Sequence, residues 1–365
     1  MNLKRFFAWA VAAVTAAALL VPAKAQGISA EKYILLDAQT RRVLESRNAD
    51  SQSLVASTTK IMTALVVCRQ TNVLSRVRIP KEAVGIEGSS MYLREGEILT
   101  VQELLYGLML SSGNDAAVAL AIYCGGSVEG FAQLMNDQAR RLGMENSHFV
   151  NPHGLDAPGH YSTAEDLAKL AAFAMDDPIF AMTVSAKTVR VGERALRNHN
   201  KLLWSLHGAD GVKTGYTKAA GRLLVSSVCR DGRRLICVTI NAPDDWQDHK
   251  TLQERGFAGF QTVQVVTRGQ VLGEIPVAGG TAPSVQLIAA EDFVYPIARG
   301  EQVELLLPGA GFVYAPVTRG DLAGAVHVLL DGSSVGTVDV LYGETCVQEK
   351  AENKTVIQRI LDFLR

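Results

Sequence analysis

Two hydrophobic periods are mixed along the first 260 residues. Apolar positions recur every three or four residues in four stretches, a spacing that predicts helices; these stretches are residues 57–70, 101–122, 129–142 and 163–175. Between them lie short apolar runs of strand character, such as YILLDA and RLICVTIN. Helices interleaved with such runs predict a mixed α and β domain.

Local signals mark where some of these elements begin, end and turn. Ser162, with Glu165 three positions later, fits a capping box that opens one helix. Gly143 fits the glycine that closes another. The segment VSSVCRDGRRLICVTI predicts a β-hairpin that turns at Asp231-Gly232.

The pattern changes near residue 260. A helix over residues 249–260 is expected to lead into the change, and from residue 261 short β-rich runs alternate with Gly, Pro and Asp-Gly turns. A chain of this length exceeds the size at which one hydrophobic core stops growing. We therefore expect a mixed domain over residues 26–260 and a small β-rich domain over residues 261–347.

Residues 348–365 return to helical spacing. Six apolar residues fall within about 160° of arc on a helix; they are Val356, Ile357, Ile360, Leu361, Phe363 and Leu364. A terminal amphipathic helix of this kind can lie in a membrane interface. The alternative is that it docks on its own protein. We favour the membrane, because we expect no other spanning segment that could tether a secreted protein there, and docking stays open.

The N-terminus has the pattern of a secretory signal peptide. Lys4 and Arg5 precede an uncharged run over residues 6–21, and Ala23-Lys24-Ala25 fits a cleavage site. A retained membrane anchor is the alternative, but a run of sixteen residues is short for a span that needs roughly 20. Cleavage after Ala25 would move the formal charge from −1 to −4, because three cations are lost. We expect an extracytoplasmic, membrane-associated protein, and the charge argues against nucleic acid as a partner.

The five cysteines show no metal-binding spacing. In the predicted hairpin Cys229 faces Arg234 and Cys237 faces Ser226, which places the two sulfurs too far apart for an easy disulfide. We interpret all five as buried thiols, and we expect neither a metal nor a cofactor.

Two Ser-x-x-Lys spacings occur in the chain. Ser29 and Lys32 lead into a strand-like run, where a spacing of three points side chains to opposite faces. Ser57 and Lys60 start a helix, where the same spacing puts both on one face. A serine hydroxyl needs a partner to accept its proton, and a desolvated lysine near a second cation can do so. On this spacing alone, a Ser57 N-cap with Lys60 extending outward stays open.

Two later segments favour the catalytic interpretation of Ser57 and Lys60 over the structural one. LMLSSGNDAA places Ser112 and Asn114 at the end of an apolar helix, where a hydroxyl and an amide can point into a cleft. GVKTGYTKAAG places Lys213, Thr214 and Gly215 at the start of a strand. Gly215 has no side chain, so a substrate backbone can lie close to that strand. The order and spacing of the three elements together indicate one site.

These segments resemble the penicillin-recognising serine enzymes, which share Ser-x-x-Lys, a Ser-x-Asn element and Lys-Thr-Gly. Within that class the chain is similar to the D-alanyl-D-alanine carboxypeptidases, or low-molecular-mass penicillin-binding proteins, in ASTTKIMTAL, SSGNDAA, FVNPHGLD, HYSTAEDLA, NHNKLLW and GADGVKTGYT. The resemblance covers residues 28–260. It implies an α+β catalytic domain of the β-lactamase/transpeptidase-like fold, with an antiparallel sheet and helices, followed by a small all-β domain and a C-terminal amphipathic helix.

By position, the resemblance implies catalytic roles for three residues. Ser57 would be the acylated nucleophile, Lys60 its general base, and Ser112 an aid to proton transfer. Asn114 would bind the substrate amide. We interpret His153, in NPHGLD, as a buried structural histidine rather than an acid or base.

The resemblance also implies how the substrate is bound. Lys213 and Thr214 would shape the electrostatic field of the site and bind the terminal carboxylate of the substrate. Arg222 is a candidate for an arginine that binds the same carboxylate. The backbone N–H groups of Ser57 and Tyr216 would form an oxyanion hole. Lys213 would also be the second cation that lowers the pKa of Lys60.

The implied function is that of a serine-type D-Ala-D-Ala carboxypeptidase acting on peptidoglycan stem peptides, with β-lactams as covalent inhibitors. A serine β-lactamase shares the three elements, but class A enzymes use a glutamate for deacylation. The expected Glu-x-x-Leu-Asn pattern is missing from ENSHFVNPHGLD. An endopeptidase or transpeptidase acting on cross-links, and a non-catalytic penicillin-binding sensor, stay open as alternatives.

Overall fold

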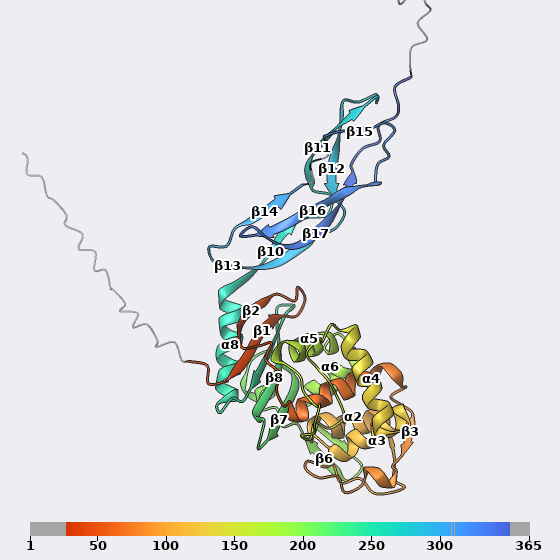
Figure 1. Ribbon diagram of the computed structural model, residues 1–365, viewed down its shortest axis with the longest axis vertical. Helices are drawn as coiled ribbons and strands as arrows, with labels where there is room; N and C mark the ends of the chain where they lie inside the picture. Colours follow the sequence, from red (N-terminus) through yellow and green to blue (C-terminus); the bar gives the residue numbers. More distant parts are fainter. Residues whose placement is uncertain (1–26, 308, 310, 351–365) are drawn as a thin grey trace, which may run out of the picture.

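The computed structural model describes residues 27–307, 309 and 311–350. The expected signal peptide (1–25) lies outside the described residues, as does all but the start of the expected C-terminal helix (348–365). In that start, Gln348 forms a β-bridge with Gly280, so the helix does not begin at residue 348. Figure 1 shows a larger N-terminal domain and an elongated β domain, joined by one long helix.

A five-stranded antiparallel sheet of order β2-β1-β9-β8-β7 forms the frame of the N-terminal domain. Its strands are β1 (Lys32–Asp37), β2 (Val43–Arg47), β7 (Ala209–Thr217), β8 (Gly221–Arg230) and β9 (Arg233–Ile240). The predicted hairpin is confirmed, since β8 and β9 meet at Asp231-Gly232 with Cys229 opposite Arg234 and Ser226 opposite Cys237. Two short hairpins pair β3 (Arg76–Arg78) with β4 (Ile98–Thr100), and β5 (Thr188–Val191) with β6 (Arg194–Arg197).

Helices cover both faces of this sheet. The helical segments of this domain are η1 (Ala56–Thr59), α1 (Lys60–Gln70), η2 (Lys81–Ala83), α2 (Val101–Leu110), α3 (Asn114–Gly125), α4 (Val128–Arg141), α5 (Ala164–Ala174), α6 (Pro178–Ser185), α7 (Leu202–Ser205) and α8 (Asp245–Gly259). The helix predicted over 101–122 is two helices, because Ser112 takes a left-handed backbone with φ of 59° that an α-helix cannot contain. The helix expected over 249–260 begins four residues earlier, at Asp245.

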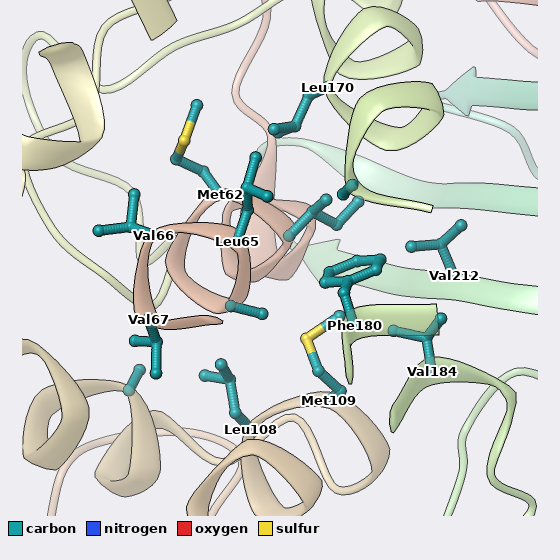
Figure 2. Close-up of a cluster of buried hydrophobic side chains, with 14 of the residues drawn as sticks. Met62, Leu65, Val66, Val67, Leu108, Met109, Leu170, Phe180, Val184 and Val212 are labelled. Atoms are coloured by element: carbon teal, nitrogen blue, oxygen red, sulfur yellow. The ribbon is translucent and has the colours of Figure 1, made fainter. Parts of the chain in front are cut away.

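Alternate residues of the central strands enter two separate cores. Ile34 and Ile236 face the main helical core, whereas Leu35 and Cys237 face α8. This two-sided burial explains why β8 and β9 are apolar almost throughout. Helix α1 lies inside the main core, and Figure 2 shows its side chains among those of neighbouring helices, with Val212 of β7 further out beside Phe180 and Val184.

Two predictions about helix ends have different outcomes. The glycine that closes a helix is confirmed, since Gly143 follows α4 with φ of 65°. The capping box at Ser162 and Glu165 is wrong: the N-cap of α5 is Thr163, whose side chain accepts from the Asp166 N–H. Ser162 instead exchanges a hydrogen bond with Ser147.

The predicted β-rich domain is confirmed. Its strands are β10 (Phe260–Val266), β11 (Val271–Ala278), β12 (Ser284–Ala289), β13 (Phe293–Ala298), β14 (Val303–Leu306), β15 (Val313–Tyr314), β16 (Leu322–Leu330) and β17 (Ser333–Tyr342). Six of them form a sheet of order β14-β16-β17-β12-β11-β15, and β10 pairs with β13. Buried valines of β16 and β17 form much of its core.

One arginine joins the two domains. Arg42, between β1 and β2, donates hydrogen bonds to the carboxylate of Glu301 and to the Pro296 carbonyl of the β domain. Its guanidinium also lies 5.1 Å from the Phe260 ring centre and 5.3 Å from that of Tyr295. Ion pairing and stacking together hold the β domain against the first hairpin.

All five cysteines are free thiols, as predicted, but the prediction that all five are buried is wrong. Cys237 and Cys346 are buried, but Cys68, Cys124 and Cys229 are partly exposed. Within residues 27–307, 309 and 311–350, no single helix is long and apolar enough to cross a membrane, although the bent pair α3 and α4 passes that test when taken together.

Candidate active site

The predicted contact between Ser57 and Lys60 is present. Residues Ala56–Thr59 form the 3-10 helix η1, and α1 continues from Lys60. Side chains three apart on a 3-10 turn eclipse each other, and Lys60 Nζ donates a 3.0 Å hydrogen bond to Ser57 Oγ. The other Ser-x-x-Lys pair diverges as expected, because Ser29 Oγ binds Asp248 and Lys32 Nζ binds Ser53.

Lys60 is fully buried among polar acceptors. Besides Ser57, its Nζ reaches Asn114 Oδ1 at 2.6 Å and the His153 carbonyl at 2.7 Å. Burial lowers the pKa of Lys60 well below its ordinary value, and the positive charge of Lys213 lowers it further. A neutral amine keeps two N–H groups for Asn114 and His153 and can turn its lone pair toward Ser57 Oγ.

The break between α2 and α3 presents the Ser-x-Asn element. Ser112 is buried and sits at the strained position of the turn, and Asn114 begins α3. The backbone N–H of Asn114 donates to the Ser89 carbonyl, and its side-chain amide donates to the Glu87 carbonyl. The neighbouring Asp115 carboxylate accepts from three groups of the same loop, Ser90, Met91 and Leu93. The loop therefore orients the Asn114 oxygen toward Lys60.

Strand β7 carries the Lys-Thr-Gly element at the edge of the sheet. Lys213 is only 1% exposed, its Nζ donates to the Thr214 carbonyl at 2.9 Å, and burial lowers its pKa to about 7. A Cβ on Gly215 would lie 3.3 Å from Thr58 and 3.4 Å from Ala56. The glycine thus lets β7 lie close to η1, which carries Ser57. We had expected a glycine here because it would make room for a substrate.

A cleft of about 330 Å³ opens where these segments meet. Five of the predicted residues line it: Ser57, Ser112, Thr214, Gly215 and Tyr216. The other three, Lys60, Asn114 and Lys213, are buried and do not line it. The structure therefore brings the predicted site together in one place, with the hydroxyl groups on the surface and the amines behind them.

Arg222, the candidate for carboxylate binding, also lines this cleft. Its backbone pairs with Tyr216 across β7 and β8. One terminal nitrogen, Nη2, donates to both oxygens of the buried Asp245 carboxylate, at 2.7 and 3.0 Å. Asp245 fixes the guanidinium, while Nε and Nη1 have no hydrogen-bond partner in the part of the chain that the structure describes.

The loop after α4 supports the nucleophile turn through backbone contacts. His153 is half-buried, and its Nδ1 accepts the Leu155 N–H, so the ring is occupied structurally. Burial, together with the charge of Lys60, lowers the pKa of His153 to about 4. The structural interpretation therefore fits, but no pattern in the chain predicted that the His153 carbonyl would contact Lys60.

Six further cleft residues were missed: Ser89, His199, Lys201, Leu223, Asp245 and Trp246. His199 and Lys201 belong to NHNKLLW, which carried the resemblance but no assigned role. Trp246 follows β9 at the start of α8, a place that only the folded chain brings to the cleft. No cluster of three or more potential metal ligands from His, Cys, Asp or Glu occurs among the residues described.

A buried lysine bound to a serine, in a cleft between a helical region and the edge strand of an antiparallel sheet, defines a serine acyl-transfer enzyme of the penicillin-recognising class. Residues 20–244 match the family model of D-alanyl-D-alanine carboxypeptidases (peptidase S11), and residues 260–348 match the C-terminal domain of penicillin-binding protein 5. The chain therefore belongs to this family and is a serine-type D-Ala-D-Ala carboxypeptidase.

Individual relatives agree with this assignment. The chain is 34% identical to the D-alanyl-D-alanine carboxypeptidase DacC of Escherichia coli, over 96% of this chain and 92% of that protein. It is 33% identical to DacA of Haemophilus influenzae, over 86% and 84% of the two chains. Among solved structures, penicillin-binding protein 5 from Haemophilus influenzae superposes with a TM-score of 0.77 at 31% identity, over 88% of this chain and 98% of that one.

Proposed function

We propose that Ser57 is the residue acylated during peptide hydrolysis and that Lys60 is its general base. Ser57 Oγ attacks the carbonyl carbon of the penultimate D-alanine while its proton passes to the neutral amine of Lys60. The proton then reaches the leaving nitrogen with help from Ser112, the C–N bond breaks, and free D-alanine departs. Water repeats the sequence on the ester, which releases the shortened peptide and restores Ser57.

The observation that carries this proposal is the 3.0 Å contact between Ser57 Oγ and an amine that is fully buried. Burial and Lys213 both favour the neutral amine, and only the neutral amine can accept a proton. The backbone N–H groups of Ser57 and Tyr216 would bind the developing oxyanion, at about 3 kcal/mol for each donor.

Recognition of the substrate follows from the same cleft. We expect the stem peptide to lie along the free edge of β7, with its amide near Asn114. The terminal carboxylate would meet the Thr214 hydroxyl and the open side of Arg222, which Asp245 holds in place. A β-lactam carries a similar carboxylate and an activated amide, so it would acylate Ser57 in the same way.

Release of D-alanine tests the assignment. The mature protein should release D-alanine from an N-acetylated L-Lys-D-Ala-D-Ala peptide, and Ser57→Ala should lose both this release and labelling by penicillin. Lys60→Ala should lose nearly as much, whereas Lys32→Ala is the matched control and should keep both. Retained labelling in Ser57→Ala would contradict the proposal.

We also propose that the protein is secreted and tethered to a membrane by its C-terminal segment. The apolar face predicted from residue 356 onward and the signal-like N-terminus support this placement. Cell fractionation would test it: the full chain should sediment with membranes, and a chain ending at Lys350 should not. Equal distribution of both chains would contradict the tether.

A further inference from the structure

The wall of the cleft around Trp246 carries two cations, Lys201 and Arg222, of which only Arg222 has a carboxylate partner. Trp246, half-buried at the start of α8, lines the cleft together with Lys201 and Arg222. The Lys201 amine lies 5.9 Å from the centre of a Trp246 ring, and the Arg222 guanidinium lies 6.0 Å from it. Both cations can therefore interact with the π face of one indole.

The charge balance of this wall predicts an anionic ligand. Asp245 is the one carboxylate among the residues that line the cleft, and it is already bound to Arg222. In the described part of the chain, the Lys201 amine has the indole contact but no hydrogen bond or ion pair. Two cations held beside one aromatic ring, with donors still free, fit a carboxylate placed between them.

We infer that three residues, Lys201, Trp246 and Arg222, close the end of the cleft where the leaving D-alanine binds. This wall makes the enzyme specific for a free C-terminal carboxylate. The inference rests on the proposed acylation of Ser57. The two cations attract the carboxylate of the last D-alanine, and the indole beside them obstructs a peptide that continues beyond that residue. Lys201 and Trp246 are specificity-determining residues in this account and take no part in bond breaking.

The chain provides a matched control for this wall. Trp204 is also flanked by two cations, Lys187 at 6.0 Å and Arg197 at 5.3 Å, but it does not line the cleft. A general effect of removing an indole or a lysine from the surface would therefore appear in Trp204→Ala and Lys187→Ala as well.

The test compares three N-acetylated peptides: L-Lys-D-Ala-D-Ala, its C-terminal amide, and the same peptide extended by one glycine. Trp246→Ala should lower the preference of kcat/KM for the free acid over the extended peptide, and Trp246→Phe should restore part of it. Lys201→Ala should raise KM for the free acid by about fivefold, as expected for an exposed ion pair, with kcat little changed. Neither control variant should alter these ratios.

Penicillin labelling distinguishes a failure of the inference about this wall from a failure of the proposed mechanism. Each variant should still be labelled at Ser57, which shows that the catalytic machinery is folded. If the parent enzyme releases D-alanine but the Trp246 and Lys201 variants keep its substrate ratios, the inference about the wall is wrong and the proposed mechanism stands. If the parent enzyme is not labelled at Ser57, the proposed mechanism fails first.

Discussion

Replacing Lys213 by methionine should remove most of the activity and yet stabilise the protein. Lys213 is fully buried, and its pKa falls from an ordinary value of 10.5 to about 7. Because one pKa unit corresponds to about 1.4 kcal/mol, this fall destabilises the folded state by about 5 kcal/mol below pH 7. Methionine has a similar shape and no charge, but it loses the hydrogen bond to the Thr214 carbonyl, at about 1–2 kcal/mol. The expected net gain is about 3 kcal/mol at pH 6.

The sign of the pH dependence follows from the lowered pKa. Between about pH 7 and 10.5 the unfolded chain holds a proton on Lys213 that the folded chain does not, so the parent protein gains stability as pH rises. The advantage of Lys213→Met should therefore be full below pH 7 and should disappear near about pH 9.5.

Urea unfolding provides the assay. Trp204 and Trp246 are the only tryptophans after the expected cleavage site, and both lie in the N-terminal domain, so their fluorescence reports the unfolding of that domain. Lys187→Met, at an exposed lysine of the same domain, is the control and should change little. A variant no more stable than the parent at pH 6, or a gain that stays constant to pH 9.5, would refute the reasoning.

In Lys213→Met the acid limb of the pH profile for residual penicillin acylation should move to higher pH, because the charge that lowers the pKa of Lys60 is gone; an unmoved limb would count against that coupling. Gly154→Ala should strongly reduce stability and penicillin labelling, since its Cβ would lie 1.8 Å from the Ala56 carbonyl oxygen. Gly143→Ala shares the positive φ but has no neighbour within 4 Å, so its urea midpoint should fall much less. Arg42→Ala should broaden the interdomain distances seen by small-angle X-ray scattering while D-alanine release stays unchanged, and an unaltered scattering curve would contradict its role at the junction.

Sequence patterns were sufficient where local rules decide the outcome. The hairpin register at Asp231-Gly232 follows from its turn, and the Ser57–Lys60 contact follows from helical spacing. The two-domain organisation followed from the change of hydrophobic period near residue 260. All of these depend on residues that are near one another in the chain.

Features that depend on tertiary contacts were not predictable in this way. Ser112 lies in a polar stretch between two apolar runs, but its left-handed backbone occurs where the next helix contacts a distant loop, whose Met91 and Leu93 N–H groups donate to Asp115. The α5 cap moved from Ser162 to Thr163 because Ser162 bonds to Ser147, fifteen residues earlier. Trp246 reaches the cleft only because α8 packs against the sheet. Contacts between segments that are far apart in the sequence cannot be predicted from the spacing of residues within one segment.

The central claim is that an unprotonated Lys60 amine activates Ser57, and mass spectrometry of the penicillin adduct tests it most directly. The parent protein should gain one penicilloyl group, located on the peptide that contains Ser57, at a rate that rises as pH passes upward through the lowered pKa of Lys60. Lys60→Ala should lose that fast acylation. An adduct on another residue, or a Lys60→Ala variant acylated as fast as the parent at neutral pH, would contradict the account.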